Sequence, residues 1–333
     1  MDKHARADQA LLSVEDLAVY FPIGGGVFSG KPQMLRAVDG VSLSIKPGES
    51  LGLVGESGCG KSTLALSILG LVNATKGRVV LDGKTVGEDT DRLDVARTVQ
   101  MVFQDPYASL NPRQTVRRTL ADPLRLHGVS NAGEVADRVA EMLRQVGLRP
   151  DQADLYPHEF SGGQRQRIGI ARALILKPKL VICDEPVSAL DVSIRAQIIN
   201  LLLELQAEMG LSYLMISHDL GVVEHMSDRV AVMYLGRIVE TGGWREIFEQ
   251  PRHPYTRALI AAIPDPLTRG LAREKARGEI PSPLNPPPGC TFNPRCPHAI
   301  DHCRAAAPML SAVDDGHLVS CWRADEFATP ISA

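Results

Sequence analysis

One glycine-rich segment, residues 55–62 with the sequence Gly-Glu-Ser-Gly-Cys-Gly-Lys-Ser, constrains this chain more than any other feature. An apolar stretch at residues 50–54 precedes it, and Leu64, Ala65 and Ile68 recur after it at helical spacing. A loop of this kind between a strand and a helix wraps its backbone N–H groups around a polyphosphate, while the lysine reaches the outer phosphates and the last hydroxyl ligates magnesium. The alternative is an ordinary glycine turn, and the flanking strand and helix favour the phosphate loop.

A second glycine-rich segment, residues 161–164 with the sequence Ser-Gly-Gly-Gln, opens a predicted helix that stops before Pro178. The start of a helix has outward N–H groups and a positive dipole end, so this segment too is suited to receive a phosphate. Arg165 and Arg167 follow directly, and we expect them to be solvated charges on the helix face. Two such segments on one chain predict a protein that closes around a nucleotide.

Two carboxylates follow a predicted strand at residues 180–183. This apolar run does not alternate, which suits a parallel strand that is buried on both faces. Asp184 and Glu185 therefore lie at the carboxyl edge of a sheet, where ligands collect in such folds. A solvated pair at a strand end is the alternative. Beside a phosphate loop we expect Asp184 in the magnesium shell and Glu185 at the attacking water, as a base or an orienting group.

Three further polar residues, Gln104, His218 and Asp191, lie at the ends of predicted strands or helices. Gln104 comes after the apolar segment 99–103, and its amide is able to touch magnesium or its water while its loop moves. His218 ends the predicted strand 211–217, and we expect it to contact the γ-phosphate, although a lone histidine is more often a packed or surface residue. Asp191 is expected to cap the helix that begins near residue 194, with or without a further role.

Composition excludes several classes of protein. The 333 residues are 44% hydrophobic and 23% charged, as in ordinary globular proteins, and a net charge of −3 makes nucleic acid an unexpected partner. The longest apolar runs are far shorter than the roughly 20 residues needed to cross a bilayer. The first residues lack the apolar stretch of a secretory signal, so we expect the chain to stay in the cytoplasm.

Four of the six cysteines, Cys290, Cys296, Cys303 and Cys321, follow a proline-rich run at residues 281–288. In a reducing compartment clustered cysteines indicate metal rather than disulfides. Their spacing differs from the paired C-x-x-C of a zinc ribbon. Four thiolates suit a [4Fe–4S] cluster or zinc, and four unliganded cysteines are the third possibility.

Taken together and in this order, these motifs resemble those of ABC transporter ATP-binding subunits, with Phe160 where many members carry leucine. The resemblance implies ATP binding by Phe21 (with Tyr20 as the alternative), Gly55, Glu56, Ser57, Gly58, Cys59, Gly60, Lys61, Ser62 and Thr63. It implies magnesium binding by Ser62, Gln104 and Asp184, and catalytic roles for Glu185, His218 and Gln104. It also implies that Ser161, Gly162, Gly163 and Gln164 cover the ATP of a partner subunit, with Asp191 in the D-loop.

Residues 103–112, residues 251–256 and the proline-cysteine tail resemble the oligopeptide/dipeptide importer branch of this family. That branch implies an ATPase at the cytoplasmic face of the inner membrane, with two membrane permease subunits, a related second ATPase and an external solute-binding protein. It also favours an iron–sulfur cluster over zinc. Three alternatives remain open: an importer subunit for nickel or another small solute, a soluble ABC ATPase of DNA repair or translation, and a redox-sensing metal module.

The predicted fold class is α/β, a P-loop NTPase core of the ABC type with an antiparallel β part. We expect this core to comprise residues 1–104 and 165–243. Residues 105–164, punctuated by prolines and rich in polar helices, are expected to form an inserted helical subdomain that carries the second glycine segment. Residues 244–333 are expected to form an extension with the four cysteines.

Overall fold

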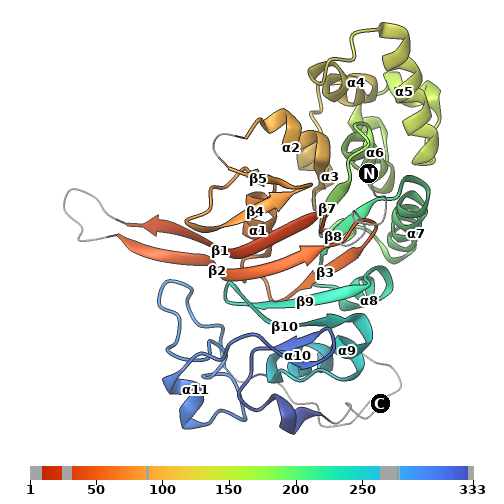
Figure 1. Ribbon diagram of the computed structural model, residues 1–333. Coiled ribbons are helices and arrows are strands. Elements are labelled where there is room, and N and C mark those ends of the chain that lie inside the picture. The colour runs from red at the N-terminus through yellow and green to blue at the C-terminus, as the bar shows by residue number, and fades with distance from the viewer. Residues whose placement is uncertain (1–9, 25–31, 88–89, 263–275, 277, 329–333) are drawn as a thin grey trace, which may run out of the picture. The chain divides into compact units, whose positions relative to one another are not determined.

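The computed structural model describes residues 10–24, 32–87, 90–262, 276 and 278–328 (Figure 1). The chain forms two compact units, and each is described by itself. Unit one comprises residues 1–12, 44–50 and 80–216, and unit two comprises residues 13–43, 51–79 and 217–333. The three-part division predicted from the sequence stays a prediction. Among the described residues, every helix is too short or too polar to cross a membrane.

Parallel strands form the centre of unit one. Strand β7 (Leu180–Asp184) lies between β6 (Val99–Val102) and β8 (Ser212–Ile216) and runs parallel to both. The side chains of residues 180–183 are fully buried, as the apolar run predicts. The parallel arrangement brings the ends of β6 and β7, and thus the residues that follow them, to one edge of the sheet.

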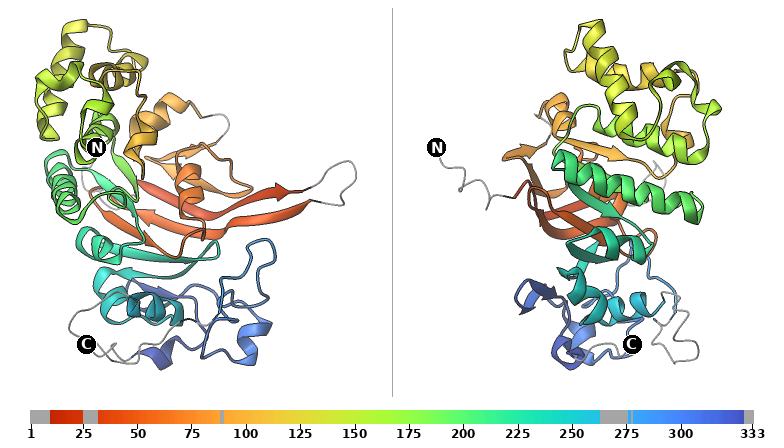
Figure 2. Two further views of the ribbon diagram at one scale, coloured as in Figure 1. Left: turned by 180° about the vertical axis from the view of Figure 1, so that it is seen from behind. Right: turned by 90° about the vertical axis from the view of Figure 1, so that its right-hand side faces the viewer.

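The remaining elements of unit one are mostly helices. In the described residues they are α2 (Arg92–Thr98), α3 (Pro106–Ser109), α4 (Val116–Leu126), α5 (Ala132–Gln145), α6 (Gly162–Leu174) and α7 (Val192–Met209), the 3-10 helices η1 (Pro150–Asp154) and η2 (Pro157–Glu159), and a short strand β5 (Lys84–Val86). Figure 2 shows α4 and α5 lying side by side. Sequence signals set their limits: Asn131 caps α5 by accepting from the backbone N–H groups of Gly133 and Glu134 at 2.8 and 3.1 Å.

Unit two contains a long hairpin and a second set of paired strands. Strands β1 (Leu12–Ile23) and β2 (Gln33–Ile45) run in opposite directions, and β4 (Lys76–Leu81) lies on the other side of β1 (Figure 1). Strand β3 (Ser50–Val54) delivers the first glycine segment and runs parallel to β9 (Arg229–Tyr234). The helix that follows the segment is α1 (Lys61–Ile68), so the predicted order of strand, loop and helix is confirmed.

The C-terminal residues extend this second set of strands. Strand β10 (Arg237–Gly243) pairs antiparallel with β9, and β12 (His317–Val319) pairs antiparallel with β10. Strand β11 (Ser311–Asp314) adds one more antiparallel partner at the end. These two strands in the tail were not predicted from the sequence. The described residues of the unit also form the short helices α8 (Leu220–Met226), α9 (Trp244–Glu249), α10 (Pro254–Ala261) and α11 (Asp301–Ala305), and the 3-10 helix η3 (Ala324–Phe327).

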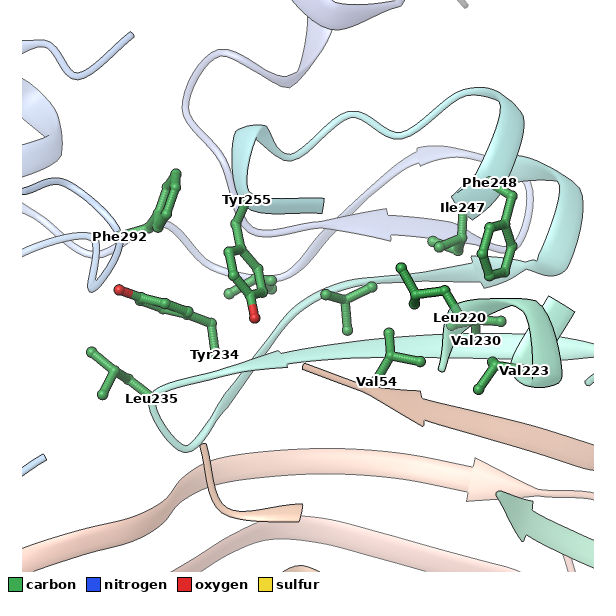
Figure 3. Close-up of a cluster of buried hydrophobic side chains, with 12 residues drawn as sticks. Val54, Leu220, Val223, Val230, Tyr234, Leu235, Ile247, Phe248, Tyr255 and Phe292 are labelled. Atoms are coloured by element: carbon green, nitrogen blue, oxygen red, sulfur yellow. The ribbon is translucent and has the colours of Figure 1, made fainter. Parts of the chain in front are cut away.

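A buried cluster joins these helices to the strands of unit two (Figure 3). Its aromatic part consists of Tyr234 at the end of β9, Tyr255 in α10 and Phe292 in the cysteine-rich tail. The ring centroids of Tyr234 and Tyr255 lie 4.6 Å apart, and Phe292 packs against Tyr234 edge to face at 5.3 Å. All three side chains are at most 1% exposed, so the tail is part of the core of unit two.

Candidate functional site

The first glycine segment forms a loop that requires glycine at position 60. Gly60 has φ of 111°, and a Cβ atom there would lie 2.1 Å from the carbonyl oxygen of Ala37. Gly60 is also the N-cap of α1, and it provides no side-chain cap for the first N–H groups of the helix. A helix start of this kind offers its N–H groups to an anion.

Lys61 and Cys59 form the buried inner side of this loop. Lys61 is 7% exposed, and its ammonium donates to the carbonyl oxygens of Gly55 and Glu56 at 2.7 and 3.0 Å. The Cys59 thiol lies 3.7 Å from the same nitrogen, and burial raises the pKa of this thiol. Ser57, Gly58 and Ser62 lie exposed around the buried lysine. The loop thus combines the Lys61 ammonium, which is held by two hydrogen bonds, with the exposed residues Ser57, Gly58 and Ser62.

Glu56 has partners that sequence reasoning missed. Its carboxylate accepts two hydrogen bonds from the guanidinium of Arg295, at 2.6 and 2.9 Å. Its backbone N–H donates to the hydroxyl of Tyr255 at 2.9 Å. The sequence did contain a signal, because a carboxylate inside an anion-binding loop indicates that a positively charged side chain lies nearby. The residues around Glu56 do not indicate that Arg295 provides this charge.

Gln104 and Glu185 meet in unit one. The amide Nε2 of Gln104 donates to a carboxylate oxygen of Glu185 at 2.7 Å. Glu185 follows β7 with φ of 49°, an uncommon backbone conformation for a residue with a side chain, and such strain is typical of functional sites. Its backbone N–H donates to Ile216 at 2.8 Å, and Ser188 donates to its carbonyl oxygen at 3.1 Å. Asp184 ends the strand beside it and is half-buried.

The second glycine segment starts α6 in a self-contained way. The hydroxyl of Ser161 accepts from the N–H of Gln164 at 3.4 Å, and the side chain of Gln164 accepts from the N–H of Ser161 at 3.0 Å. This reciprocal pair is a capping box. A Cβ atom at Gly163 would lie 2.5 Å from Cγ2 of Ile194, so this glycine lets α6 approach the start of α7. Phe160, which directly precedes the segment, is buried.

The prediction for the two arginines that follow this segment is wrong. Arg165 donates to the carbonyl oxygen of Pro157 at 2.6 Å, and its guanidinium lies 4.1 Å from the ring centroid of Tyr107. Arg167 donates to the carbonyl oxygen of Val146 at 2.7 Å. Both side chains therefore hold α6 to neighbouring segments of unit one instead of standing in solvent.

The predicted site residues Asp191, His218 and Phe21 lie at or near the ends of helices and strands. Asp191 caps α7 as expected, because its carboxylate accepts from the N–H of Ile194 at 3.0 Å, and this bond lowers the pKa of the carboxyl. His218, in unit two, is exposed and directly precedes Asp219, the N-cap of α8. Phe21 is 36% exposed near the end of β1, whereas the hydroxyl of Tyr20 bonds to the carboxylate of Asp39.

The four tail cysteines, Cys290, Cys296, Cys303 and Cys321, line one small cavity of about 20 Å³ in unit two. This volume holds about one water molecule. Burial raises the pKa of Cys290 to about 11 and that of Cys321 to about 12. All six cysteines are among the described residues and none forms a disulfide. Within the described part of the chain, no three His, Cys, Asp or Glu side chains are placed as ligands of one metal ion.

Comparison with known proteins identifies the family. Residues 38–188 match the family model described as ABC transporter, and residues 239–303 match the one described as Oligopeptide/dipeptide transporter, C-terminal region. The oligopeptide transport ATP-binding protein OppF of Salmonella typhimurium is 54% identical over 325 residues, which is 95% of this chain and 97% of that protein. The chain belongs to the ABC transporter ATP-binding proteins of the oligopeptide/dipeptide branch.

Two other relatives are similar in sequence over nearly the whole chain. AppF of Bacillus subtilis, an oligopeptide transport ATP-binding protein, is 50% identical over 95% of this chain and 98% of its own length. The dipeptide transport ATP-binding protein DppF of Haemophilus influenzae is 48% identical over 98% of this chain and 100% of its own length.

Two solved ABC structures resemble this protein. CbiO1 of Clostridium perfringens, part of the transporter complex cbiONQ, has a TM-score of 0.62 at 29% identity and covers 72% of this chain and 91% of its own. The ATP-binding cassette MJ0796, bound to ADP and phosphate, has a TM-score of 0.61 at 28% identity and covers 70% of this chain and 99% of its own. The predicted family, the P-loop α/β fold class and the ATPase class are confirmed.

Proposed function

We propose that this protein hydrolyses ATP to energise the import of dipeptides or oligopeptides across the cytoplasmic membrane. The phosphate loop carries the ATPase half of the proposal: Gly60 closes against a backbone carbonyl, and Lys61 is buried inside the loop. The peptide half is supported by relatives about 50% identical over nearly the whole chain, which are named as oligopeptide or dipeptide transport ATP-binding proteins.

The site residues have the following proposed roles. Residues 55–63 hold the phosphates of ATP, and Phe21 stacks on the adenine. Magnesium is bound by Ser62, Gln104 and Asp184. Glu185 orients or deprotonates the attacking water, and its hydrogen bond to Gln104 at 2.7 Å supports a shared task. His218 contacts the γ-phosphate, and residues 161–164 cover the ATP of the partner ATPase, beside the D-loop residue Asp191.

Replacing the proposed water-orienting carboxylate tests this mechanism. Glu185→Gln keeps the shape of the side chain and removes its charge, so turnover of ATP should fall at least about 100-fold while ATP still binds. The matched control is Glu204→Gln, an exposed position in α7. Phosphate release and binding of a labelled ATP would be measured on each full-length variant. Substantial hydrolysis by Glu185→Gln would contradict the role.

The proposed partners are two membrane permease subunits, a related but distinct second ATPase and, indirectly, an external solute-binding protein. The segment after Gln104 and the helical elements at 105–164 receive the membrane subunits, and the exposed aromatic rings of Phe103 and Tyr107, 41% and 62% exposed, suit such a contact. The protein thus acts at the cytoplasmic face of the inner membrane. Cross-linking from Tyr107 to two membrane proteins would support this, and a chain that purifies from cells without them would not.

The substrate is tested by transport itself. The complete transporter, reconstituted in vesicles with its binding protein, should accumulate a labelled dipeptide or oligopeptide when ATP is supplied. Accumulation of nickel or another small solute, with no peptide uptake, would favour the alternative cargo. A chain that hydrolyses ATP, associates with no membrane subunit and drives no uptake of any solute would favour a soluble ABC ATPase.

The cysteine cavity is the proposed site of a [4Fe–4S] cluster, with zinc as the alternative. Four thiols line this cavity, and an all-thiol donor set suits either metal centre. Protein purified without oxygen should contain about four irons and absorb in the visible range, and Cys290→Ser should abolish both signals. The buried Cys183→Ser is the control, since this thiol lies in β7. Colourless, metal-free protein would contradict the proposal.

A further inference from the structure

Glu56 is an acidic residue in a loop that is expected to bind anions. The loop is built to attract phosphates, yet its second residue carries a negative charge. An uncompensated carboxylate a few ångströms from a triphosphate repels it, and the repulsion is strong where water is partly excluded. The Glu56 side chain is only 28% exposed, so solvent screens it incompletely. Something other than water must neutralise this charge.

Arg295 provides that neutralisation from the other end of the sequence. Both terminal nitrogens of its guanidinium bond to the two carboxylate oxygens of Glu56, which is the bidentate geometry of a strong ion pair. Arg295 is 239 residues away in sequence and its side chain is 7% exposed. The carboxylate is thereby fixed toward the tail. Both residues belong to unit two.

The C-terminal extension, residues 244–333, also holds the backbone of the phosphate loop. The hydroxyl of Tyr255, in α10, accepts the N–H of Glu56 at 2.9 Å. Tyr255 and Arg295 are themselves fixed by the aromatic cluster of Figure 3, since the Arg295 guanidinium lies 5.8 Å from the ring centroid of Tyr234 and 5.9 Å from that of Phe292. Rigid neighbours reduce the entropy lost when a loop is held in one conformation.

We propose that Arg295 and Tyr255 are positioning residues of the ATP site, which neutralise Glu56 and hold the phosphate loop in its anion-binding form. The C-terminal extension is therefore needed for tight binding of ATP, beyond any role in contacting other subunits or a metal. This inference rests on the proposed function, because it assumes that the loop binds ATP. Its distinctive consequence is electrostatic: the benefit of Arg295 increases with the charge of the nucleotide.

The test compares nucleotide binding by full-length variants. Arg295→Met removes the guanidinium and keeps an apolar stem, and we expect the Kd of a fluorescent ATP analogue to rise on the order of tenfold. The Kd of the matching AMP analogue should rise less. The double variant Glu56→Gln/Arg295→Met removes both charges, so it should bind ATP nearly as tightly as the wild type. Arg304→Met is the control, because Arg304 pairs with Asp301 on the surface of the same tail.

The outcomes separate this inference from the proposed function. A wild-type protein that binds no ATP contradicts both. Wild-type binding together with an unchanged Kd in Arg295→Met, or a double variant as weak as Arg295→Met, overturns the inference alone. If Arg295→Met does not fold, Glu56→Gln decides: ATP binding no weaker than in the wild type supports a purely compensating role for the arginine, and binding at least fivefold weaker refutes it.

Discussion

The two glycine-rich segments look alike in sequence, but they are held in different ways. The phosphate loop before α1 has no side-chain cap at Gly60, and its conformation depends on distant residues such as Ala37, Tyr255 and Arg295. The segment before α6 caps itself through Ser161 and Gln164. Glycine therefore permits an unusual backbone conformation in the phosphate loop, whereas at the start of α6 it permits the close packing of two helices.

This difference teaches how a helix start becomes an anion site. At the start of α1 no side chain caps the backbone N–H groups, which suits the binding of an anion. At α6 one of them is already paired with the hydroxyl of Ser161. Arg165 and Arg167 tie α6 to its neighbours in unit one, so its position depends on the packing of that unit.

The largest effect is expected where glycine cannot be replaced. In Gly60→Ala the new methyl group would lie 2.1 Å from a backbone oxygen at a φ of 111°, so we expect a loss of about 4 kcal/mol in the free energy of unfolding and no ATP binding. Gly162→Ala is the matched change in the second segment, where the nearest atom would be 3.9 Å away. It should cost less than about 1 kcal/mol. Chemical denaturation would measure both, and equal losses would break the comparison.

Acid should weaken the support of the phosphate loop. His253, the N-cap of α10, is buried and neutral: its Nδ1 accepts from the N–H of Tyr255 at 3.0 Å, and its backbone N–H donates to Glu240, which also bonds to His317. Burial lowers the pKa of His253 to about 4, against about 6.5 in the unfolded chain. Its stabilising contribution is complete above about pH 6.5 and is lost as the pH falls toward 4, by up to about 3 kcal/mol.

Unfolding free energies at pH 7 and pH 5 would check this expectation. His253→Asn keeps a capping acceptor and removes the titrating ring, so the decrease on acidification should become smaller. His158→Asn changes an exposed histidine just before the second segment and serves as the control. If the wild type and His253→Asn lose the same stability at pH 5, the histidine is not the cause.

A smaller effect is expected at the packing glycine of α6. In Gly163→Ala the methyl group would lie 2.5 Å from Cγ2 of Ile194, and overpacking of this kind costs about 1 to 2 kcal/mol. Ile194→Ala removes that atom, so the two changes should be non-additive in a double-mutant cycle of thermal unfolding. Additive losses would show that the glycine is needed for another reason.

The smallest effect concerns the caps. Ser161→Ala removes the acceptor for the N–H of Gln164 and should lower stability by about 0.5 to 1 kcal/mol. Ser57→Ala, an exposed position of the phosphate loop, should change stability by less than about 0.5 kcal/mol. A larger loss for Ser57→Ala in thermal unfolding would reverse the contrast between the two helix starts.

Much of the fold could be predicted because its signals are local. The apolar run at 180–183 marked a buried parallel strand, and Asp191 marked a helix start, since both patterns depend only on neighbouring residues. The wrong expectation for Arg165 and Arg167 has the opposite cause. Whether a charged side chain on a helix meets solvent or another segment depends on packing, which local charge patterns do not contain. The short tail strands β11 and β12 were missed because they are defined by pairing with β10.

The sequence by itself determined the family that the motifs resemble, and it predicted which loop binds phosphate and which carboxylates serve magnesium and water. These follow from residue types at short, fixed spacings. Only the tertiary structure decided how the glycine segments are held. Glu56 meets Arg295 across 239 residues of sequence, and Gly163 meets Ile194 on another helix, because such contacts depend on the path of the whole chain. The first segment was recognisable as a phosphate loop, but its dependence on the tail was not.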